Sequence, residues 1–204
     1  MSTKLLGCSA VLVLFLLTGL GLAFFLFGQF NALVAGEQAV VAQWAQVESV
    51  YQRRADLIPN LVETVRAASE FEQETLNEIV EARSRVGQVT LNADEVLNDP
   101  VAFERFQRAQ SQLSGALQRL LVVIERYPEL KSVQAFRDLM TQLEGTENRI
   151  AVQRMRFNDA ARDYNVRLNS VPTRGFVGLL GWGFEERAYF KSTPGAEEAP
   201  RVEF

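Results

Sequence analysis

Apolar side chains between Gln43 and Val65 recur at gaps of three and four residues, the spacing that lines up one face of an α-helix. Pro59 lies within this pattern, where a proline removes one backbone hydrogen bond and its ring crowds the carbonyl four residues earlier, at Ala55. No glycine, Asn-Gly or Asp-Gly signal precedes Pro59, and the apolar phase continues across it. The pattern therefore predicts one helix that is kinked at Pro59.

The same spacing predicts three long helices in all. The apolar phase of the first helix continues over about 31–86, whereas residues 87–98 lose the pattern and are predicted to form a loop. A second helix is predicted over 100–127, because an Asn-Asp pair suited to capping precedes Pro100, a favourable first helical residue. A third helix is predicted over 132–171. Together they predict an all-α protein built as a long antiparallel bundle.

The lengths of these helices predict how they pair. The second helix matches the part of the first helix that follows Pro59, each being roughly 42 Å long at ~1.5 Å per residue. Antiparallel pairing would bring the turn at 127–131 to the height of Pro59, where Lys131 could reach Asp56.

The part of the first helix before the kink, 31–58, would then have no partner from its own chain. It carries an apolar stripe that includes Trp44 and Val47, and an uncovered stripe of that length is costly in water. We therefore expect these segments of neighbouring protomers to associate, which would make the protein a homo-oligomer.

The third helix contains polar residues in its apolar phase. Glu147 and Arg154 either form a partly buried polar layer that fixes the register or flank the seam, and the pattern leaves both readings open. Gly145 predicts a close helix contact or a bend, because glycine weakens a helix by about 1 kcal/mol relative to alanine.

Residues 5–27 form an uncharged apolar run that is about 23 residues long, roughly 34 Å as a helix, which is enough to cross a bilayer. The following residues, 28–31, offer no small-x-small cleavage site, so a retained transmembrane helix is favoured over a signal peptide. Lys4 precedes the run and Glu37 is the first charged residue after it. This charge difference predicts a cytoplasmic amino end and an extracytoplasmic bundle.

The glycine- and aromatic-rich stretch GFVGLLGWGF, at 175–184, does not fit a phosphate-binding loop, because no strand precedes it and no suitably placed lysine or serine follows it. It fits an apolar cap on the bundle, a partner-binding strip or a membrane-interface strip better. The predicted division of the chain is a short tail at 1–4, a transmembrane helix at 5–27, the bundle at 28–172, the apolar strip at 173–190 and a polar, disordered tail at 191–204.

Composition limits the chemistry that the chain can perform. It has no histidine, and its single cysteine is Cys8, so zinc sites of the Cys/His type, histidine-activated nucleophiles, haem ligation by histidine and an internal disulfide are excluded. No catalytic residue, metal site or cofactor is therefore predicted. The net charge of −4 and the lack of a basic stripe argue against nucleic acid as a partner.

Several motifs in this order resemble the LemA family of bacterial membrane proteins. They are RRADLIPNLV at 53–62, RYPELK at 126–131, LEGTENRI at 143–150, the pairs Phe157-Asn158 and Tyr164-Asn165, and GLLG at 178–181. The resemblance covers nearly the whole chain from Gly28 to about Phe190 and implies a membrane anchor followed by a long helical bundle, in the bacterial inner membrane. It implies no particular biochemical activity.

We expect a membrane-anchored, non-catalytic scaffold that self-associates through its amphipathic helices. The alternative is an adaptor that docks on another membrane protein, such as a protease, kinase or transporter. The expected partners are the lipid bilayer, through 5–27, further copies of the chain, and a second membrane protein. The candidate interaction surface comprises Trp44, Val47, Arg53, Arg54, Asp56, Pro59, Asn60, Tyr127, Pro128, Lys131, Phe176 and Trp182.

Overall fold

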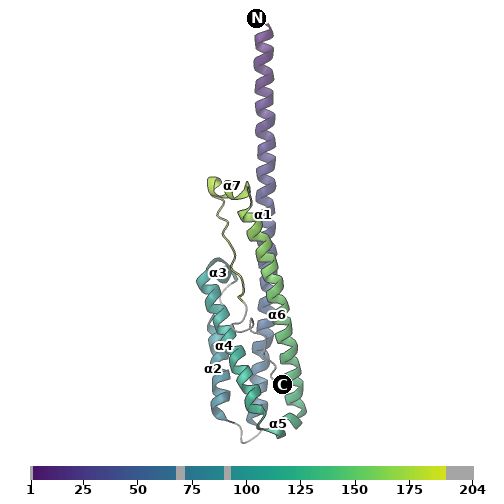
Figure 1. Cartoon of the computed structure of the whole chain (residues 1–204), viewed down its shortest axis with the longest axis vertical. Coiled ribbons are helices and arrows are strands. Elements are labelled where there is room, and N and C mark those ends of the chain that lie inside the picture. The colour runs from purple at the N-terminus through teal and green to yellow at the C-terminus, as the bar shows by residue number, and fades with distance from the viewer. Residues whose placement is uncertain (1, 68–71, 90–92, 192–204) are drawn as a thin grey trace, which may run out of the picture.

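A computed structural model describes residues 2–67, 72–89 and 93–191, and every regular element in these ranges is a helix (Figure 1). The predicted tail at 191–204 lies outside the described residues, apart from Lys191. The helices are α1 (Ser2–Arg66), α2 (Gln73–Val89), α3 (Ala93–Asn98), α4 (Pro100–Ile124), α5 (Pro128–Ser132), α6 (Gln134–Asn169) and α7 (Thr173–Leu180).

Helix α1 is 65 residues long, and its amino-terminal part projects alone beyond the bundle (Figure 1). Its apolar side chains there are exposed, for example Phe15 at 80% and Leu16 at 71%. Among the described residues, α1 is the one helix that is long and apolar enough to cross a membrane, with a mean hydropathy of 2.1 over its most apolar window. The predicted all-α class and the long apolar amino-terminal helix are thus confirmed.

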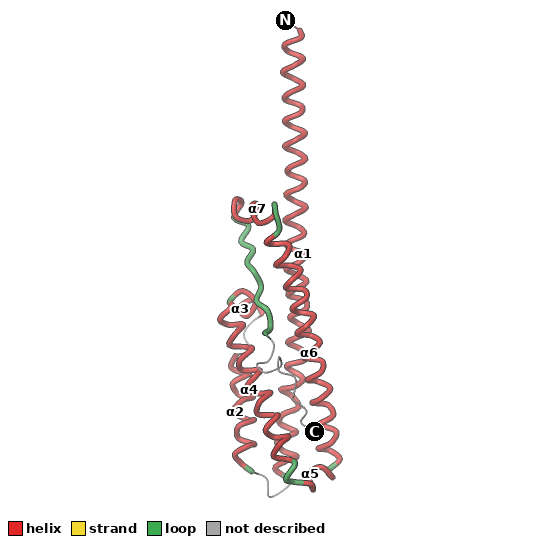
Figure 2. The backbone as a smooth tube through the Cα atoms, viewed as in Figure 1, coloured by secondary structure: helices red, strands yellow, loops and turns green. Residues whose placement is uncertain are grey.

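The remainder of α1 forms an up-and-down bundle with α2, α4 and α6, in which successive long helices run in opposite directions (Figure 2). Helix α1 packs mainly against α6, and α2 packs mainly against α4. Helix α4 pairs antiparallel with residues that were predicted to be its partner, but these residues form a separate helix, α2, and are not a continuation of α1. The predicted single helix over 31–86 is wrong, because α1 ends at Arg66 and α2 returns beside it.

Two smaller corrections concern the chain around these helices. Residues 87–98 were predicted to be a loop, yet α2 extends to Val89 and α3 begins at Ala93, where Val96 and Leu97 are buried. Gly145 makes no close helix contact, since a Cβ at that position would meet no atom within 4 Å.

The start of α4 follows the predicted capping signal. The Asp99 side chain accepts a hydrogen bond of 2.8 Å from the Val101 backbone amide, and Pro100 is the first helical residue. The helix ends at Ile124, just before the Tyr127-Pro128 pair that the sequence places at its end.

Pro59 lies inside α1, which continues across it as predicted. Because a proline has no amide hydrogen, the Ala55 carbonyl loses its normal helical donor. The Arg83 side chain of α2 supplies a donor instead, with its Nε 3.0 Å from the Ala55 oxygen. Pro59 therefore opens a backbone acceptor on α1 that helps to attach α2.

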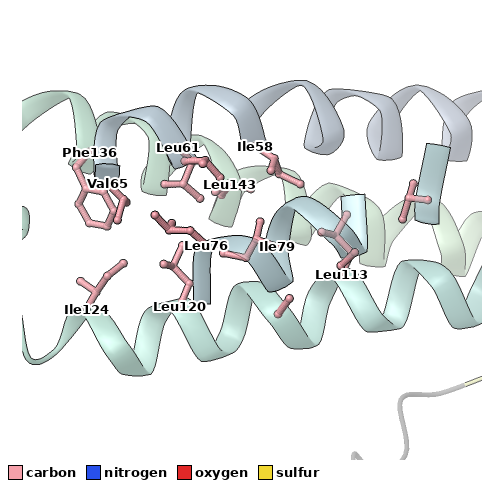
Figure 3. Packing of buried hydrophobic residues seen from close by; sticks show 14 of the residues in the cluster. Ile58, Leu61, Val65, Leu76, Ile79, Leu113, Leu120, Ile124, Phe136 and Leu143 are labelled. Atoms are coloured by element: carbon pink, nitrogen blue, oxygen red, sulfur yellow. The ribbon is translucent and has the colours of Figure 1, made fainter. Parts of the chain in front are cut away.

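The core consists of two clusters. The distal cluster surrounds the carboxyl end of α1 and is drawn in Figure 3; it includes Ile58, Leu61, Val65, Leu76, Ile79, Leu113, Leu120, Ile124, Phe136 and Leu143. The second cluster is called membrane-proximal because it lies nearer to the apolar segment of α1 that can cross a membrane. It includes Leu33, Val40, Trp44, Val47, Tyr51, Phe103, Phe106, Phe157, Tyr164 and Phe190.

The membrane-proximal cluster overturns the predicted bare stalk. Trp44 is 2% exposed and Val47 is fully buried, and the Trp44 ring lies 5.0 Å from that of Phe106 and 5.7 Å from that of Phe157. The prediction failed because α6, at 36 residues, is long enough to follow α1 past the stripe. Trp44 and Val47 therefore belong to the core and are not available as a surface between protomers.

Candidate functional site

A layer of buried and half-buried polar side chains separates the two clusters. Arg54 of α1 is 1% exposed, and its Nη1 donates to Ser114 Oγ at 2.7 Å and to Glu147 Oε1 at 2.8 Å. Its Nη2 donates to the Gln110 side chain at 2.5 Å and to the Gln110 carbonyl at 3.3 Å. The layer therefore joins α1, α4 and α6 at one height. Glu147 belongs to it, which confirms the prediction that this residue is part of a partly buried polar layer.

The charge of Arg54 requires that this layer contain a carboxylate and hydrogen-bond acceptors. A buried guanidinium is tolerated only when it is paired and hydrogen-bonded, and the Glu147 side chain, 43% exposed, supplies the carboxylate. The guanidinium also lies 5.1 Å from the centre of the Tyr51 ring, and burial raises the pKa of that phenol. Sliding a helix by one turn would separate Arg54 from Glu147, so the pair favours a single register.

A groove of about 410 Å³ opens beside this layer, between α4 and α6. Leu61 and Leu120 are its most buried lining residues, whereas Leu121 is 42% exposed. Glu147 links the groove with the polar layer because it lines the former and holds Arg54 in the latter. The complete lining is Leu61, Ser114, Leu117, Gln118, Leu120, Leu121, Met140, Leu143, Glu144, Glu147 and Asn148.

The chemistry of this groove suits binding. Its lining is mostly apolar, its ionisable members are the two carboxylates Glu144 and Glu147, and it contains no basic side chain. Such a surface accepts an apolar segment that carries a positive charge. Within the described residues, no cluster of three or more His, Cys, Asp or Glu side chains is placed to hold a metal ion.

Two asparagines on α6 hold the chain that follows α7. Asn158 donates to the Phe190 carbonyl and accepts from the Phe190 amide, both at 2.9 Å. Asn165 does the same for Arg187, at 2.8 Å and 2.9 Å. Seven helical residues and three extended residues each span roughly 10 Å, so the two repeats match.

These asparagine clamps give the Phe157-Asn158 and Tyr164-Asn165 pairs a structural meaning. The ring of each pair is buried in the membrane-proximal cluster, and the neighbouring amide faces the returning chain. Sequence reasoning noted both pairs but missed this role. The signal that could have revealed it is the seven-residue repeat of an aromatic residue followed by asparagine.

The returning segment carries a second buried arginine. Arg187 is 6% exposed, forms an ion pair with Glu37 of α1, and donates to Asn98 and, at 3.0 Å, to the Leu97 carbonyl at the end of α3. Lower in the bundle, the Lys191 carbonyl accepts from Arg154 of α6 at 2.6 Å and from Gln107 of α4 at 3.1 Å. The segment therefore fastens α1, α3, α4 and α6 together.

The aromatic residues of the apolar strip contact α1 near the end of its apolar segment. The Phe176 ring lies 6.2 Å from Phe25, and the Trp182 ring lies 5.2 Å from Phe30. The strip is helical as α7 and then extended. Gly181 ends the helix with a φ of 61°, a left-handed conformation that glycine adopts without strain.

The structure distributes the other predicted surface residues along α1 and around α5. Arg53, Asp56, Pro59 and Asn60 are exposed on α1, Pro128 and Lys131 are exposed at α5, and Tyr127 is half-buried against the distal cluster. Arg54, by contrast, is core.

The predicted contact between Lys131 and Asp56 is not formed. Lys131 pairs with Glu125 at 2.5 Å, and Asp56 accepts from Gln52, one turn earlier on its own helix, at 2.8 Å. The turn at α5 lies lower than Asp56 because α1 extends beyond Pro59 to Arg66 before the chain reverses.

The fold defines an all-helical bundle protein whose first helix can cross a membrane. Within that class the chain belongs to the LemA family, whose model matches residues 43–204. It is 28% identical over 184 residues to "Magnetosome protein MamQ" of Magnetospirillum gryphiswaldense, covering 83% of this chain and 67% of that protein. It is 25% identical, with the same coverage, to "Magnetosome protein MamQ 1" of Paramagnetospirillum magneticum. It is 22% identical to "Protein LemA" of Metamycoplasma hominis, over 76% of this chain and 67% of that protein.

Proposed function

We propose that this protein is a membrane-anchored, non-catalytic scaffold that holds a docking groove at a fixed height above the bilayer. The observation that carries this proposal is the continuity of α1, which supplies both the apolar segment and the central helix of the core. A single unbroken helix transmits position and orientation, whereas a flexible linker would not. The absence of histidine from the chain is consistent with a non-enzymatic role.

The groove between α4 and α6 is the docking surface in this proposal, and its occupant is an amphipathic, basic segment of another membrane protein. The exposed Leu121 and the half-buried Leu117 and Met140 offer an apolar floor to such a segment. Glu144, which is exposed, favours a positive charge on the occupant, whereas Arg54 already balances the charge of Glu147. Two copies of the chain placed groove to groove would bring their Glu144 carboxylates together, which disfavours self-association at this surface.

A spin or fluorescent label at Met140→Cys, in a Cys8→Ala background, tests the groove in zwitterionic nanodiscs. An amphipathic Leu/Lys helical peptide should shield this label, while a label at the exposed Val122 of α4, outside the groove, should not change. Glu144→Lys should weaken binding of that peptide by about tenfold, as expected for reversal of one charge at an interface. Equal shielding at both labels, or no effect of Glu144→Lys, would contradict the proposal.

The same label also tests whether a second copy of the chain, and not a segment of another protein, occupies the groove. If the label at Met140→Cys is already shielded without peptide, and mass measurement of the detergent-solubilised chain gives a dimer, the groove serves a second copy. In that case Leu121→Glu should give a monomer that keeps its helical signal, and Val122→Glu should remain dimeric.

The bundle is proposed to lie outside the cytoplasm, in the bacterial inner membrane, because Lys4 precedes the apolar segment. Val152, which is 41% exposed on α6, offers a reporter position. A cysteine there, in the Cys8→Ala background, should react with an impermeant maleimide in intact cells. Reaction only after lysis would reverse the orientation.

A further inference from the structure

Helix α7 and Val171, two residues before it, present unusually exposed apolar side chains. Val171 is 92% exposed and Leu179 is 81% exposed, the highest values among the large apolar side chains described outside α1. Leu180 adds a third at 47%. An apolar group of this kind on a short helix is costly in water, so another surface is expected to cover it.

The position of α7 indicates what that surface is. Figure 1 shows α7 lying across the direction of α1, at the level where α1 leaves the bundle. The Thr173 hydroxyl donates to Gln29 Oε1 at 3.1 Å, and the Phe176 ring packs edge-on against Phe25. Phe25 belongs to the apolar segment that ends at Phe27, so α7 lies beside the last turns of the segment that can cross a membrane.

The side chains of α7 suit the boundary between lipid and water. Arg174 lines the same open apolar surface as Val171, Phe176 and Leu179, and an arginine among apolar side chains is typical of helices that lie in the headgroup region. Trp182, just beyond the helix, is half-buried against Phe30, and tryptophan is enriched at this depth.

We propose that α7 is an interfacial helix that lies on the bilayer surface, with Leu179, Leu180 and Val171 in contact with lipid and Arg174 at the phosphates. A lipid surface is favoured over a protein partner because the exposed face of α7 is continuous, through Phe176 and Phe25, with the apolar flank of α1. The protein would then touch the membrane at two places, and the second contact would prevent the bundle from tilting or rotating freely about α1.

The two tryptophans of the chain provide a matched test in lipid vesicles. Trp44→Phe leaves Trp182 as the reporter, and Trp182→Phe leaves the buried Trp44 as its control. Lipids brominated near the headgroup should quench Trp182 about twofold more than lipids brominated deep in the acyl chain, and neither should quench Trp44 appreciably. Absence of quenching at Trp182 would overturn the inference.

A second measurement avoids any change in the core. A nitroxide at Leu179→Cys, in the Cys8→Ala background, should relax faster with oxygen, which concentrates in lipid, than with a water-soluble nickel complex. A nitroxide at Val122→Cys on α4 should show the opposite preference. A nickel preference at Leu179, or shielding from both reagents, would mean that water or protein covers α7 and would refute the lipid contact.

Discussion

At the scale of residues, two buried arginines decide how the elements meet. Arg54 joins α1, α4 and α6, and Arg187 joins the returning segment to α1 and α3. The terminal nitrogens of each guanidinium are paired with acceptors, because an unpaired guanidinium in the core would cost several kcal/mol, although neither Nε has a partner among the described residues. The apolar faces of long helices alone would permit several arrangements. The two arginines select one of them, because only that arrangement pairs their charges.

The pair of Arg54 with Glu147 makes a first prediction. Glu147→Leu should lower the free energy of unfolding by about 2 kcal/mol, less than for a fully buried pair because Glu147 is partly solvated. The additional change Arg54→Met should recover part of this loss, since it removes the stranded charge. Glu144→Leu, one turn away and exposed, should have little effect. Denaturant unfolding followed by circular dichroism checks this, and a silent Glu147→Leu would contradict it.

Tyr164 makes a second prediction. Its hydroxyl is buried without a hydrogen-bond partner among the described residues, and burial raises the pKa of the phenol above its usual 10. Tyr164→Phe should therefore stabilise the protein by about 1 kcal/mol at neutral pH, because it removes an unpaired polar group.

The raised pKa of Tyr164 also sets the sign of a pH effect. The unfolded phenol ionises near pH 10 and the folded one only at higher pH, so the wild type keeps its full stability below pH 10 and loses it as the pH rises further. Tyr164→Phe should lose less stability between pH 9 and 11, as measured by thermal melting. Tyr51, whose pKa burial also raises, remains in both proteins, and identical slopes would count against this account of Tyr164.

At the scale of elements, the returning segment is held mainly by side chain to backbone bonds. Asn165→Ala removes both bonds to Arg187 and should increase hydrogen exchange of the Arg187 amide by on the order of tenfold. Asn148→Ala, an exposed asparagine on the same helix, is the matched control. Mass spectrometry of segment 184–191 would show the difference. Equal exchange in the two variants would mean that the bonds from Asn165 do not protect the Arg187 amide and that the other contacts of the segment, including the stacking of Phe190 on Trp44, are sufficient.

Pro59 offers a further test at this scale. Pro59→Ala restores an amide donor for the Ala55 carbonyl and so competes with Arg83 for it. We expect an unchanged helical signal and a change in stability within about 1 kcal/mol, because one hydrogen bond replaces another. Loss of helical signal by circular dichroism would show that Pro59 ends a helix.

The helices themselves were largely predictable from sequence. Apolar spacing located α4 and α6, and the Asn-Asp-Pro sequence marked the start of α4. The reversal after Arg66 was missed because the apolar phase continues through it and no glycine or proline marks it. Spacing reports which face of a helix is apolar, but it cannot report that the chain has changed direction.

The candidate site was less predictable for a related reason. Glu147 drew attention because a charged residue interrupted an apolar phase, but Gln110 and Ser114 resemble ordinary surface residues in the sequence. Trp44 was assigned to an interface because the pairing argument compared only the first two helices, although the third helix was predicted to be long enough to pass this stripe, as α6 does. The groove depends on the spacing between α4 and α6, which no local pattern encodes.

At the scale of the whole molecule, α1 joins the apolar segment that can cross a membrane to the bundle without a break. Its apolar segment, its contacts with α6 and its carboxyl end in the distal cluster belong to one helix. Where α1 leaves the bundle, Phe25 contacts Phe176 of α7 and Phe30 contacts Trp182. These contacts support α1 at a point where it would otherwise bend freely. The proposed scaffold role, the fixed height of the groove and the proposed contact of α7 with lipid all depend on this continuity.

The most direct measurement is therefore a distance along α1 across the membrane boundary. Two spin labels, at Leu20 in the apolar segment and Gln46 on the exposed side of the bundle, are placed in the Cys8→Ala chain in nanodiscs. An unbroken helix predicts a narrow distance distribution centred at roughly 39 Å, for 26 residues at ~1.5 Å each. A broad distribution, or one centred well below that value, would show a hinge between anchor and bundle and would contradict the account.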